Sequence, residues 1–323
     1  MEFQSGGDIV RGWLYTPDRG DGPFPTIVMA GGWCYVKELV QPHYAEMYAN
    51  AGLAALLFDY RNFGSSDGAR RQHIDPNMQL ADYRNAISFA ETLDEVDAER
   101  IGVWGLSYSG GHALILGATD PRVKCVASQI PVIDGYRNMR RVHGTVGFRK
   151  FQELLLEDRR RRFATGEDGF LPHAAPDPLT EISTWPFAET YSTFVELKAA
   201  EAPAYENRST IESAELLMSY SVDPFLPRLL DVPTLVVVAE EDDLTLWIRD
   251  RGLRAHSDRQ EAPGRDRQLD AHDAVQRPLA AAPGGAGGDR VVRRASGRAR
   301  ARKRGMTTSR RPTAASATKG GRG

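Results

Sequence analysis

The stretch RIGVWGLSYSGG, residues 100–111, constrains the fold of this chain more than any other. In it, a short apolar run leads into a Gly-x-Ser turn, and small residues that suit the start of a helix follow. Gly105 and Gly110 leave room for a sharp turn that lifts the hydroxyl of Ser107 clear of the backbone. Glycine and serine also make ordinary turns, but the apolar run before this turn and the helix pattern after it favour a nucleophile elbow.

Short apolar runs alternate with helical patterns over the first three quarters of the chain. Such runs are typical of strands buried on both faces. The expected strands cover residues 8–17, 25–30, 54–60, 100–105, 123–132 and 233–239, and the expected helices cover residues 43–52, 77–93 and 109–118. This alternation predicts right-handed crossovers and a mostly parallel sheet. Ser107 would then lie at the carboxyl end of a central strand, where open α/β sheets place their sites.

Two details of packing follow from the same patterns. In the helix expected over 77–93, Leu80 and Tyr83 recur at helical spacing on a packed face, while Asp82 is expected on the opposite, solvent-facing side. Cys34 and Cys125 are too few for a disulfide framework and lack the spacing of metal ligands. We expect Cys125, which lies in an apolar run, to be a buried small hydrophobic residue.

Composition limits the class of protein. The chain has 323 residues, of which 41% are hydrophobic, enough for one large core and a cap. No apolar run approaches the roughly 20 residues of a membrane span. The N-terminus lacks the basic and then apolar pattern of a signal segment, so we expect a soluble, cytoplasmic protein. No feature of the sequence predicts an oligomeric state.

The formal charge of −2 hides an uneven distribution of charge along the chain. Residues 248–323 hold 19 Lys and Arg against 7 Asp and Glu, whereas residues 1–247 hold 22 against 36. The same 76 C-terminal residues contain none of the 28 aromatic residues and only 8 of Ile, Leu, Val and Met. Such a segment cannot bury enough surface to offset its ordering entropy, and we expect a disordered basic tail.

Three parts are therefore expected. An α/β core comprises residues 1–133 and 231–247, and a basic, low-complexity tail comprises residues 248–323. Residues 134–230 form an insertion that is too long for a bare loop and is rich in helical patterns, which predicts a cap over the site. The basic cluster Arg159–Arg162 in this cap could bind an anionic group, although charge runs are more often solvated helix faces.

A second loop could supply the donors that an acyl-transfer serine needs for its oxyanion. Ala30-Gly31-Gly32-Trp33-Cys34 follows an expected strand, and its two glycines fit a close approach of the backbone. We expect the backbone N–H groups of Trp33 and Tyr108 to form the oxyanion hole. Cys34 could instead be a reactive thiol there, but no base adjoins it in the sequence, so packing is the favoured interpretation.

The catalytic acid is expected in the turn Ala239-Glu240-Glu241-Asp242, after the last expected strand. Asp242 is our choice and Asp243 the reserve, with a solvated acidic turn as the alternative. Four consecutive carboxylates repel one another, and a neighbouring histidine would offset that repulsion. His256 and His272 are the only histidines that follow, and His272, which has the better spacing, is the expected base. We expect His112, which lies just after the elbow, to be packed in the core.

From Met1 to Trp247 these motifs resemble bacterial α/β-hydrolases of the dienelactone-hydrolase and X-Pro-peptidase-like type. The elbow resembles their Gly-x-Ser-Tyr-x-Gly motif, and residues 59–68 resemble their Asp-x-Arg-Gly-x-Gly-x-Ser loop. The resemblance implies an α/β-hydrolase fold and cleavage of an ester, thioester or amide in a small-molecule acyl substrate. In that reaction Ser107 attacks, a histidine is the base and Asp242 orients it, with no metal or organic cofactor.

The chain departs from this family after Trp247, where the family has a further helix, a strand and a histidine loop. One hypothesis is a reading-frame slip near Trp247. Residues 247–278 can be back-translated so that the +1 frame encodes a helix, a strand and a Thr-His-Met loop, although the choice of synonymous codons leaves much freedom. A genuine basic extension is the alternative, and the nucleotide sequence of the gene decides between them.

Two further functions stay open. Related sites transfer acyl groups to other acceptors, as the fungal polyketide transferases that resemble this group do. A non-catalytic pseudo-hydrolase is the second, in which the basic tail would bind nucleic acid or acidic membrane surfaces with strong salt dependence. Turnover of p-nitrophenyl acetate and labelling of Ser107 by a fluorophosphonate distinguish an enzyme from a binding module.

Overall fold

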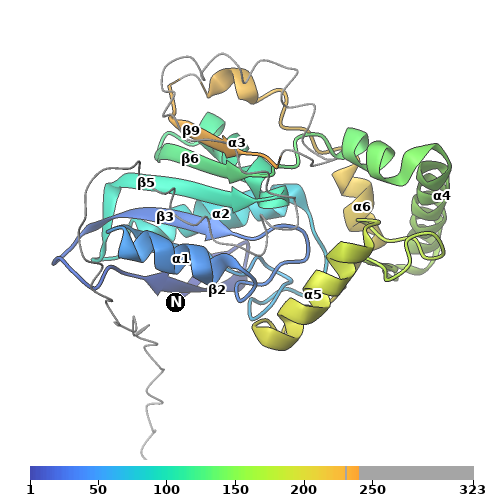
Figure 1. The fold of residues 1–323 in the computed structure, drawn as a ribbon, viewed down its shortest axis with the longest axis horizontal. Helices are drawn as coiled ribbons and strands as arrows, with labels where there is room; N and C mark the ends of the chain where they lie inside the picture. Colours follow the sequence, from blue (N-terminus) through green and yellow to red (C-terminus); the bar gives the residue numbers. More distant parts are fainter. Residues whose placement is uncertain (230, 240–323) are drawn as a thin grey trace, which may run out of the picture. The chain divides into compact units, whose positions relative to one another are not determined.

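The structure is a computed structural model that describes residues 1–229 and 231–239. Its centre is a seven-stranded sheet in the order β1-β2-β4-β3-β5-β6-β9 (Figure 1). The strands are β1 Glu2–Ser5, β2 Asp8–Tyr15, β3 Phe24–Ala30, β4 Ala54–Phe58, β5 Val96–Leu106, β6 Val123–Gln129 and β9 Thr234–Val237. β1 and β2 are antiparallel to their neighbours and the rest run parallel, so the mostly parallel sheet is confirmed.

Helices cover both faces of this sheet (Figure 1). α1, Gln41–Asn50, lies on one face, and α2, Pro76–Ala90, and α3, Tyr108–Thr119, lie on the other. α2 begins where Asp75 caps it, because its carboxylate accepts hydrogen bonds from the backbone N–H groups of Asn77 and Met78. No helix of the described residues is long and apolar enough to cross a membrane.

The packed face of α2 is as expected, but its polar face is not. Leu80 and Tyr83 are buried, whereas Asp82, expected toward solvent, is also fully buried. The carboxylate of Asp82 accepts a hydrogen bond from the hydroxyl of Ser5 at 2.5 Å and one from the guanidinium of Arg61 at 2.6 Å. A buried charge with a partner and several donors is tolerated, and neither donor adjoins Asp82 in the sequence.

The sequence patterns gave no sign of β1. Its four residues contain a single large apolar side chain, Phe3, which pairs in register with Val10 of β2. Gly6 and Gly7 join the two strands with φ of 57° and 94°. Since two successive residues with positive φ favour glycine, this Gly-Gly pair between strands is a hairpin signal.

A mostly helical segment separates β6 from β9. It contains α4 Gly135–Thr165, β7 Phe170–Pro172, α5 Ala188–Ala200, β8 Arg208–Thr210, α6 Ile211–Leu217 and the short 3-10 helix η1 Leu226–Arg228. α4 bends at Gly144, whose φ of 60° and ψ of −177° are not helical. The antiparallel pair β7 and β8 forms a second, small sheet.

Ion pairs join this segment to the core. The guanidinium of Arg70, in the loop between β4 and α2, contacts Asp168 at 2.5 Å and Glu212 at 2.6 Å. At the end of α5, Glu201 accepts hydrogen bonds from the backbone N–H of Val40 at 3.0 Å and pairs with His43 at 2.8 Å. Surface pairs of this kind contribute little individually, so they position the segment more than they stabilise it.

The basic cluster Arg159–Arg162 is occupied by acidic neighbours. Arg159 pairs with Glu215 of α6, and Arg161 with Asp158 of its own helix. Arg162 contacts Asp158 at 2.7 Å and Glu215 at 2.6 Å. Since three of its four guanidinium groups already have carboxylate partners, the cluster is a charged helix face and offers little to an external anion.

Cys125 is exposed, so the expectation of a buried residue is wrong. The pairing of β5 with β6 shifts register between Ile101 and Gly102, and Lys124 is skipped in that pairing. This irregularity interrupts the alternation of β6, and Lys124 and Cys125 are both exposed. An apolar run therefore did not guarantee burial here.

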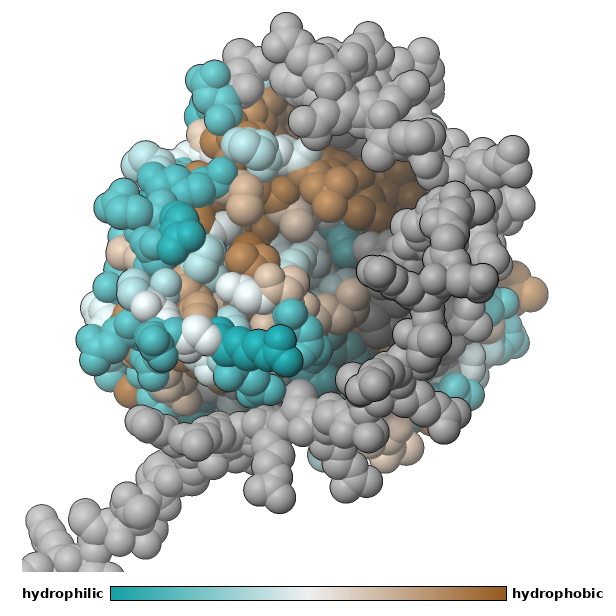
Figure 2. Space-filling view, turned by 60° about the vertical axis from the view of Figure 1, so that its left-hand side comes forward, coloured by the Kyte–Doolittle hydropathy of each residue, from teal (hydrophilic) through white to brown (hydrophobic). Residues whose placement is uncertain are grey.

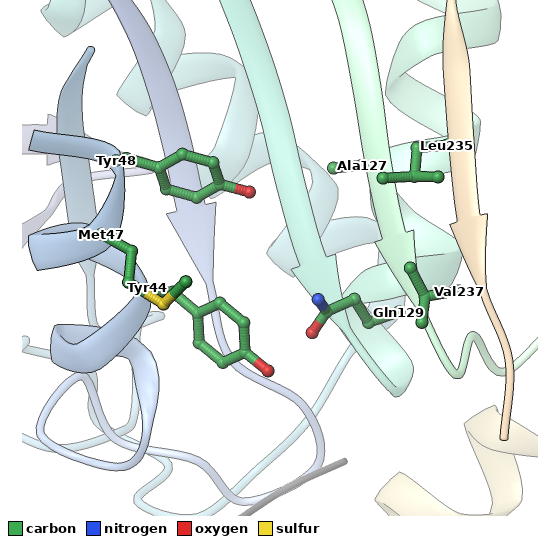
Figure 3. A pocket seen from close by; sticks show the side chains of 7 residues that line it. All are labelled: Tyr44, Met47, Tyr48, Ala127, Gln129, Leu235 and Val237. Atoms are coloured by element: carbon green, nitrogen blue, oxygen red, sulfur yellow. The ribbon is translucent and has the colours of Figure 1, made fainter. Parts of the chain in front are cut away.

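Apolar residues gather in a patch on one face of the molecule (Figure 2). A trough of about 150 Å³ lies between α1 and the strands β6 and β9 (Figure 3). Its lining residues are Tyr44, Met47, Tyr48, Ala127, Gln129, Leu235 and Val237. Leu235 is 60% exposed. The lining offers no carboxylate, amine, imidazole or thiol, and burial raises the pKa of its two phenol groups, Tyr44 and Tyr48, so both stay protonated at neutral pH.

Candidate active site

Ser107 occupies the turn between β5 and α3 with φ of 59° and ψ of −116°. A non-glycine residue rarely adopts such angles, which cost on the order of 1–3 kcal/mol and persist only where neighbours enforce them. Here the backbone of Ser107 is held on both sides. Its N–H donates to the carbonyl of Gln129 at 2.8 Å, and its carbonyl accepts from the N–H groups of Gly110 and Val132, each at 3.0 Å.

Two glycines make this turn sterically feasible. A Cβ atom on Gly105 would collide with the backbone of Ser109 and Gly110, so only glycine fits before the turn. A Cβ atom on Gly32 would lie 3.1 Å from Cβ and 3.5 Å from Oγ of Ser107. The loop after β3, which is the expected oxyanion loop, therefore approaches the serine hydroxyl closely.

The elbow contains two serines with different surroundings. The hydroxyl of Ser109 is fully buried, donates to the carbonyl of Ala30 at 2.6 Å and accepts from the N–H of Leu106 at 2.9 Å. Ser107 is partly exposed, and its hydroxyl has no hydrogen-bond partner among the described residues. Ser109 thus fastens the elbow to β3, and only Ser107 offers a hydroxyl to a substrate.

The two expected oxyanion donors are both available. Neither the N–H of Trp33 nor that of Tyr108 donates to any group within residues 1–229 and 231–239. Tyr108 is the first residue of α3, where unpaired N–H groups and the helix dipole favour negative charge. The side chains of these two residues pack edge to face with ring centroids 5.2 Å apart. Trp33 and Tyr108 therefore stay the predicted oxyanion donors.

The loop over residues 59–68 supports the expected oxyanion loop through hydrogen bonds. The buried carboxylate of Asp59 accepts hydrogen bonds from the backbone N–H of Lys37 at 2.6 Å and from its ammonium group at 2.8 Å. It also accepts from the N–H of Ser65 at 2.8 Å. This buried pair ties the chain just after Trp33 to the end of β4, which limits how far the oxyanion loop can move.

None of the five histidines in the described part of the chain contacts Ser107; they are His43, His73, His112, His143 and His173. His112 is fully buried between Tyr220 and Gln79, each at 3.0 Å, which confirms the expected packing. Burial lowers the pKa of His112 to about 3 and that of His173, also buried, to about 3. Both are neutral at pH 7, and neither is placed to take a proton from the serine.

Cys34 is packed and not reactive. Its side chain is buried, and its sulfur donates a hydrogen bond to the carbonyl of Arg208 at 3.4 Å. Burial raises the pKa of the thiol well above its ordinary value, which disfavours the nucleophilic thiolate. Burial and the raised pKa therefore both favour the packed interpretation of Cys34 over a cysteine nucleophile.

The expected acid and base lie outside the described residues. Asp242, its reserve Asp243, and His256 and His272 all follow Ala239, so their roles stay predictions. Within the described residues, no group of three or more His, Cys, Asp and Glu side chains is arranged to hold a metal ion.

Sequence patterns missed two aromatic residues that reach the site from the helical segment. Trp185 contacts Trp33, with ring centroids 6.4 Å apart, and Tyr220 contacts Tyr108, with ring centroids 4.8 Å apart. Both lie in irregular stretches between helices. No local periodicity could have identified them, because the contacts arise only when distant segments fold together.

Known proteins are similar to this chain in sequence and in fold. The X-Pro dipeptidyl-peptidase (S15) family matches residues 6–214. The quorum-quenching protein AidA of Acinetobacter baumannii (strain MDR-ZJ06) is 34% identical over 197 residues, which are 61% of this chain and 64% of that protein. The thiohydrolase apmlB of Arthrinium phaeospermum is 32% identical over 252 residues, 76% of this chain and 79% of that protein.

A solved structure has a similar fold. The structure of DcsB in complex with its substrate analogue superposes with a TM-score of 0.66 at 25% identity, over 77% of this chain and 83% of that one. The match to AidA spans slightly less than two thirds of that relative. The chain belongs to the X-Pro dipeptidyl-peptidase (S15) family and has the α/β-hydrolase fold.

Proposed function

We propose that this protein is an enzyme, a serine hydrolase that cleaves an ester, thioester or amide through an acyl-serine at Ser107. One observation carries the proposal: the hydroxyl of Ser107, which has no hydrogen-bond partner in the described part of the chain, sits on a strained strand-to-helix turn directly against Gly32 of the expected oxyanion loop. Relatives named thiohydrolase, such as apmlB, favour a thioester among the three substrate classes.

The proposed reaction has two halves. Oγ of Ser107 bonds to the carbonyl carbon and gives its proton to the base, while the N–H groups of Trp33 and Tyr108 stabilise the oxyanion. The bond to the leaving thiolate, alkoxide or amine breaks, and that group takes the proton. Water then attacks the acyl-serine and releases the carboxylic acid. His272 is the proposed base and Asp242 the proposed acid that orients it.

Fluorophosphonate labelling of the full chain tests the nucleophile. Mass spectrometry should find the label on Ser107, and Ser107→Ala should abolish it. Ser109→Ala is the matched control, because Ser109 lies in the same turn but its hydroxyl is buried and already bonded. Label on Ser109, or none on any serine of the folded wild type, would contradict the proposal. Absence of label together with salt-sensitive retention on DNA would favour the pseudo-hydrolase with a polyanion-binding tail.

The proposed acid and the proposed base can each be tested against a control residue of the same type. If the assignments hold, Asp242→Asn and His272→Gln should each lower the rate of acylation by orders of magnitude, while Asp243→Asn and His256→Gln should leave it near the wild-type value. If a variant and its control lower the acylation rate equally, the assignment of that acid or base is wrong. The nucleotide sequence across codon 247 tests the reading-frame slip independently: a +1 frame that meets stop codons or lacks a histidine loop excludes it.

Acyl transfer is the second candidate. The acyltransferase drtE of Aspergillus calidoustus is 30% identical over 222 residues, 68% of this chain and 70% of that protein. In this case the acyl-serine would react with an alcohol in preference to water. Adding increasing concentrations of a primary alcohol to a thioester assay and measuring the ratio of ester to acid distinguishes transfer from hydrolysis.

A further inference from the structure

The two proposed oxyanion residues share an unusual environment. Trp33 and Tyr108 pack against each other, and each also packs against one aromatic residue of the helical segment between β6 and β9. Trp185 lies on Trp33 and Tyr220 lies on Tyr108. All four side chains are buried, with exposed fractions between 1% and 6%. Edge-to-face and tilted aromatic contacts of this kind have defined geometry and contribute about 0.5–1.5 kcal/mol each beyond burial.

Tyr220 is fixed tightly against the first turns of α3. Its hydroxyl hydrogen-bonds Nδ1 of His112 at 3.0 Å, and the ring of His112 lies 4.6 Å from that of Tyr108. A Cβ atom on Gly111 would lie only 2.5 Å from the Tyr220 hydroxyl, so glycine is needed for this approach. A shift of Tyr220 must therefore move Tyr108, His112 or the helix that carries both.

Trp185 is fixed in a similar way on the other side. Its N–H donates to the carbonyl of His173 at 2.9 Å, and its carbonyl accepts from the hydroxyl of Ser183 at 3.2 Å. These bonds hold the backbone at Trp185 in place, and the indole then limits where Trp33 can lie. The proposed oxyanion donor is the backbone N–H of Trp33. The contact between the two indole rings limits the position of Trp33 and, with it, the direction of this N–H.

We infer, on the basis of the proposed function, that Trp185 and Tyr220 are positioning residues for the oxyanion hole. Through them the helical segment fixes the two donor N–H groups relative to Ser107, in addition to any contact that it makes with substrate. Donors stabilise an oxyanion only when they are held in place before the reaction, and a displacement of about 1 Å can lower a rate by a factor of about 100.

A substrate with a very short acyl chain separates positioning from substrate binding. On p-nitrophenyl acetate, Trp185→Leu and Tyr220→Leu should lower kcat about 10-fold or more with little change in KM, because the donors lose their support. Trp185→Phe and Tyr220→Phe, which keep a ring in place, should recover most of the rate. Phe163→Leu is the control, since Phe163 lies in the same segment but is almost fully exposed.

A readout that does not need turnover keeps this test separate from that of the proposed function. In protein selectively labelled with ¹⁵N-tyrosine, Tyr220→Leu should shift or broaden the backbone amide resonance of Tyr108, and Phe163→Leu should not. If the wild type is inactive but this coupling is present, the proposed function fails, and only the structural coupling of Tyr220 to the Tyr108 amide stands. Folded variants with wild-type kcat on acetate, or with an unchanged Tyr108 amide, would overturn the inference.

Discussion

Two buried histidines should make this fold sensitive to acid. His112 and His173 are both buried, and burial lowers the pKa of each to about 3, against an ordinary value of 6.5. Between these values the unfolded chain binds a proton at each site that the folded chain does not bind. The free energy of unfolding must therefore fall as the pH drops below about 6.5 and continue to fall toward pH 3.

The size of this effect follows from the shift. Each histidine should lower the free energy of unfolding by about 1.4 kcal/mol at pH 5.5 and by about 2.7 kcal/mol at pH 4.5, so the pair accounts for roughly twice these values. That is a large share of the 5–15 kcal/mol typical of a folded domain. Acid unfolding should begin well above the pKa values of ordinary carboxylates.

Urea unfolding followed by tryptophan fluorescence at pH 7.5, 6.5, 5.5 and 4.5 measures this dependence. Replacing either histidine by glutamine should reduce the slope of stability against pH by up to about 1.4 kcal/mol per pH unit, even though the variant is less stable at neutral pH. Leu56→Ala, which is destabilised without loss of a titrating group, should keep the wild-type slope. If His112→Gln loses stability with falling pH in parallel with the wild type, the burial argument is wrong for His112.

Two further outcomes follow from single contacts. Gly32→Ala should lower the rate of fluorophosphonate labelling at least 10-fold while the protein stays folded, because the added methyl group would lie 3.1 Å from Cβ of Ser107 and 3.0 Å from the carbonyl oxygen of Leu106, closer than an ordinary contact. Gly147→Ala controls for a change of glycine, because Gly147 has no positive φ and its added methyl group would make only an ordinary contact of 3.4 Å with Cβ of His143. Equal labelling in both variants would contradict the proposed approach. Leu235→Ala in β9 should change the free energy of unfolding by less than about 1 kcal/mol, whereas Leu56→Ala in the centre of the sheet should cost about 2–5 kcal/mol. A cost above 2 kcal/mol for Leu235→Ala in urea unfolding would show that the apolar trough is covered in solution.

The elements that sequence predicted best are those whose pattern is local and continuous. The buried strand β4 is a run of five apolar residues, and the elbow is a short apolar strand, a tight turn and a helix within twelve residues. The predictions that failed depend on distant partners. Asp82 is buried because Arg61 and Ser5 reach it, and Cys125 is exposed because the pairing of β6 with β5 is irregular.

The sequence by itself determined the order of strands β2–β6 and β9 and of helices α1–α3, the position of the serine turn and the sharp change in composition after Trp247. These features are written in neighbouring residues, since backbone propensity and periodic burial act over a few turns or strand lengths. Only the tertiary structure decided that the Ser109 hydroxyl is bonded while that of Ser107 has no partner among the described residues, and that Trp185 and Tyr220 lie on Trp33 and Tyr108. Such contacts join segments far apart in the chain, so they exist only once the sheet has formed and the intervening helices have packed against it.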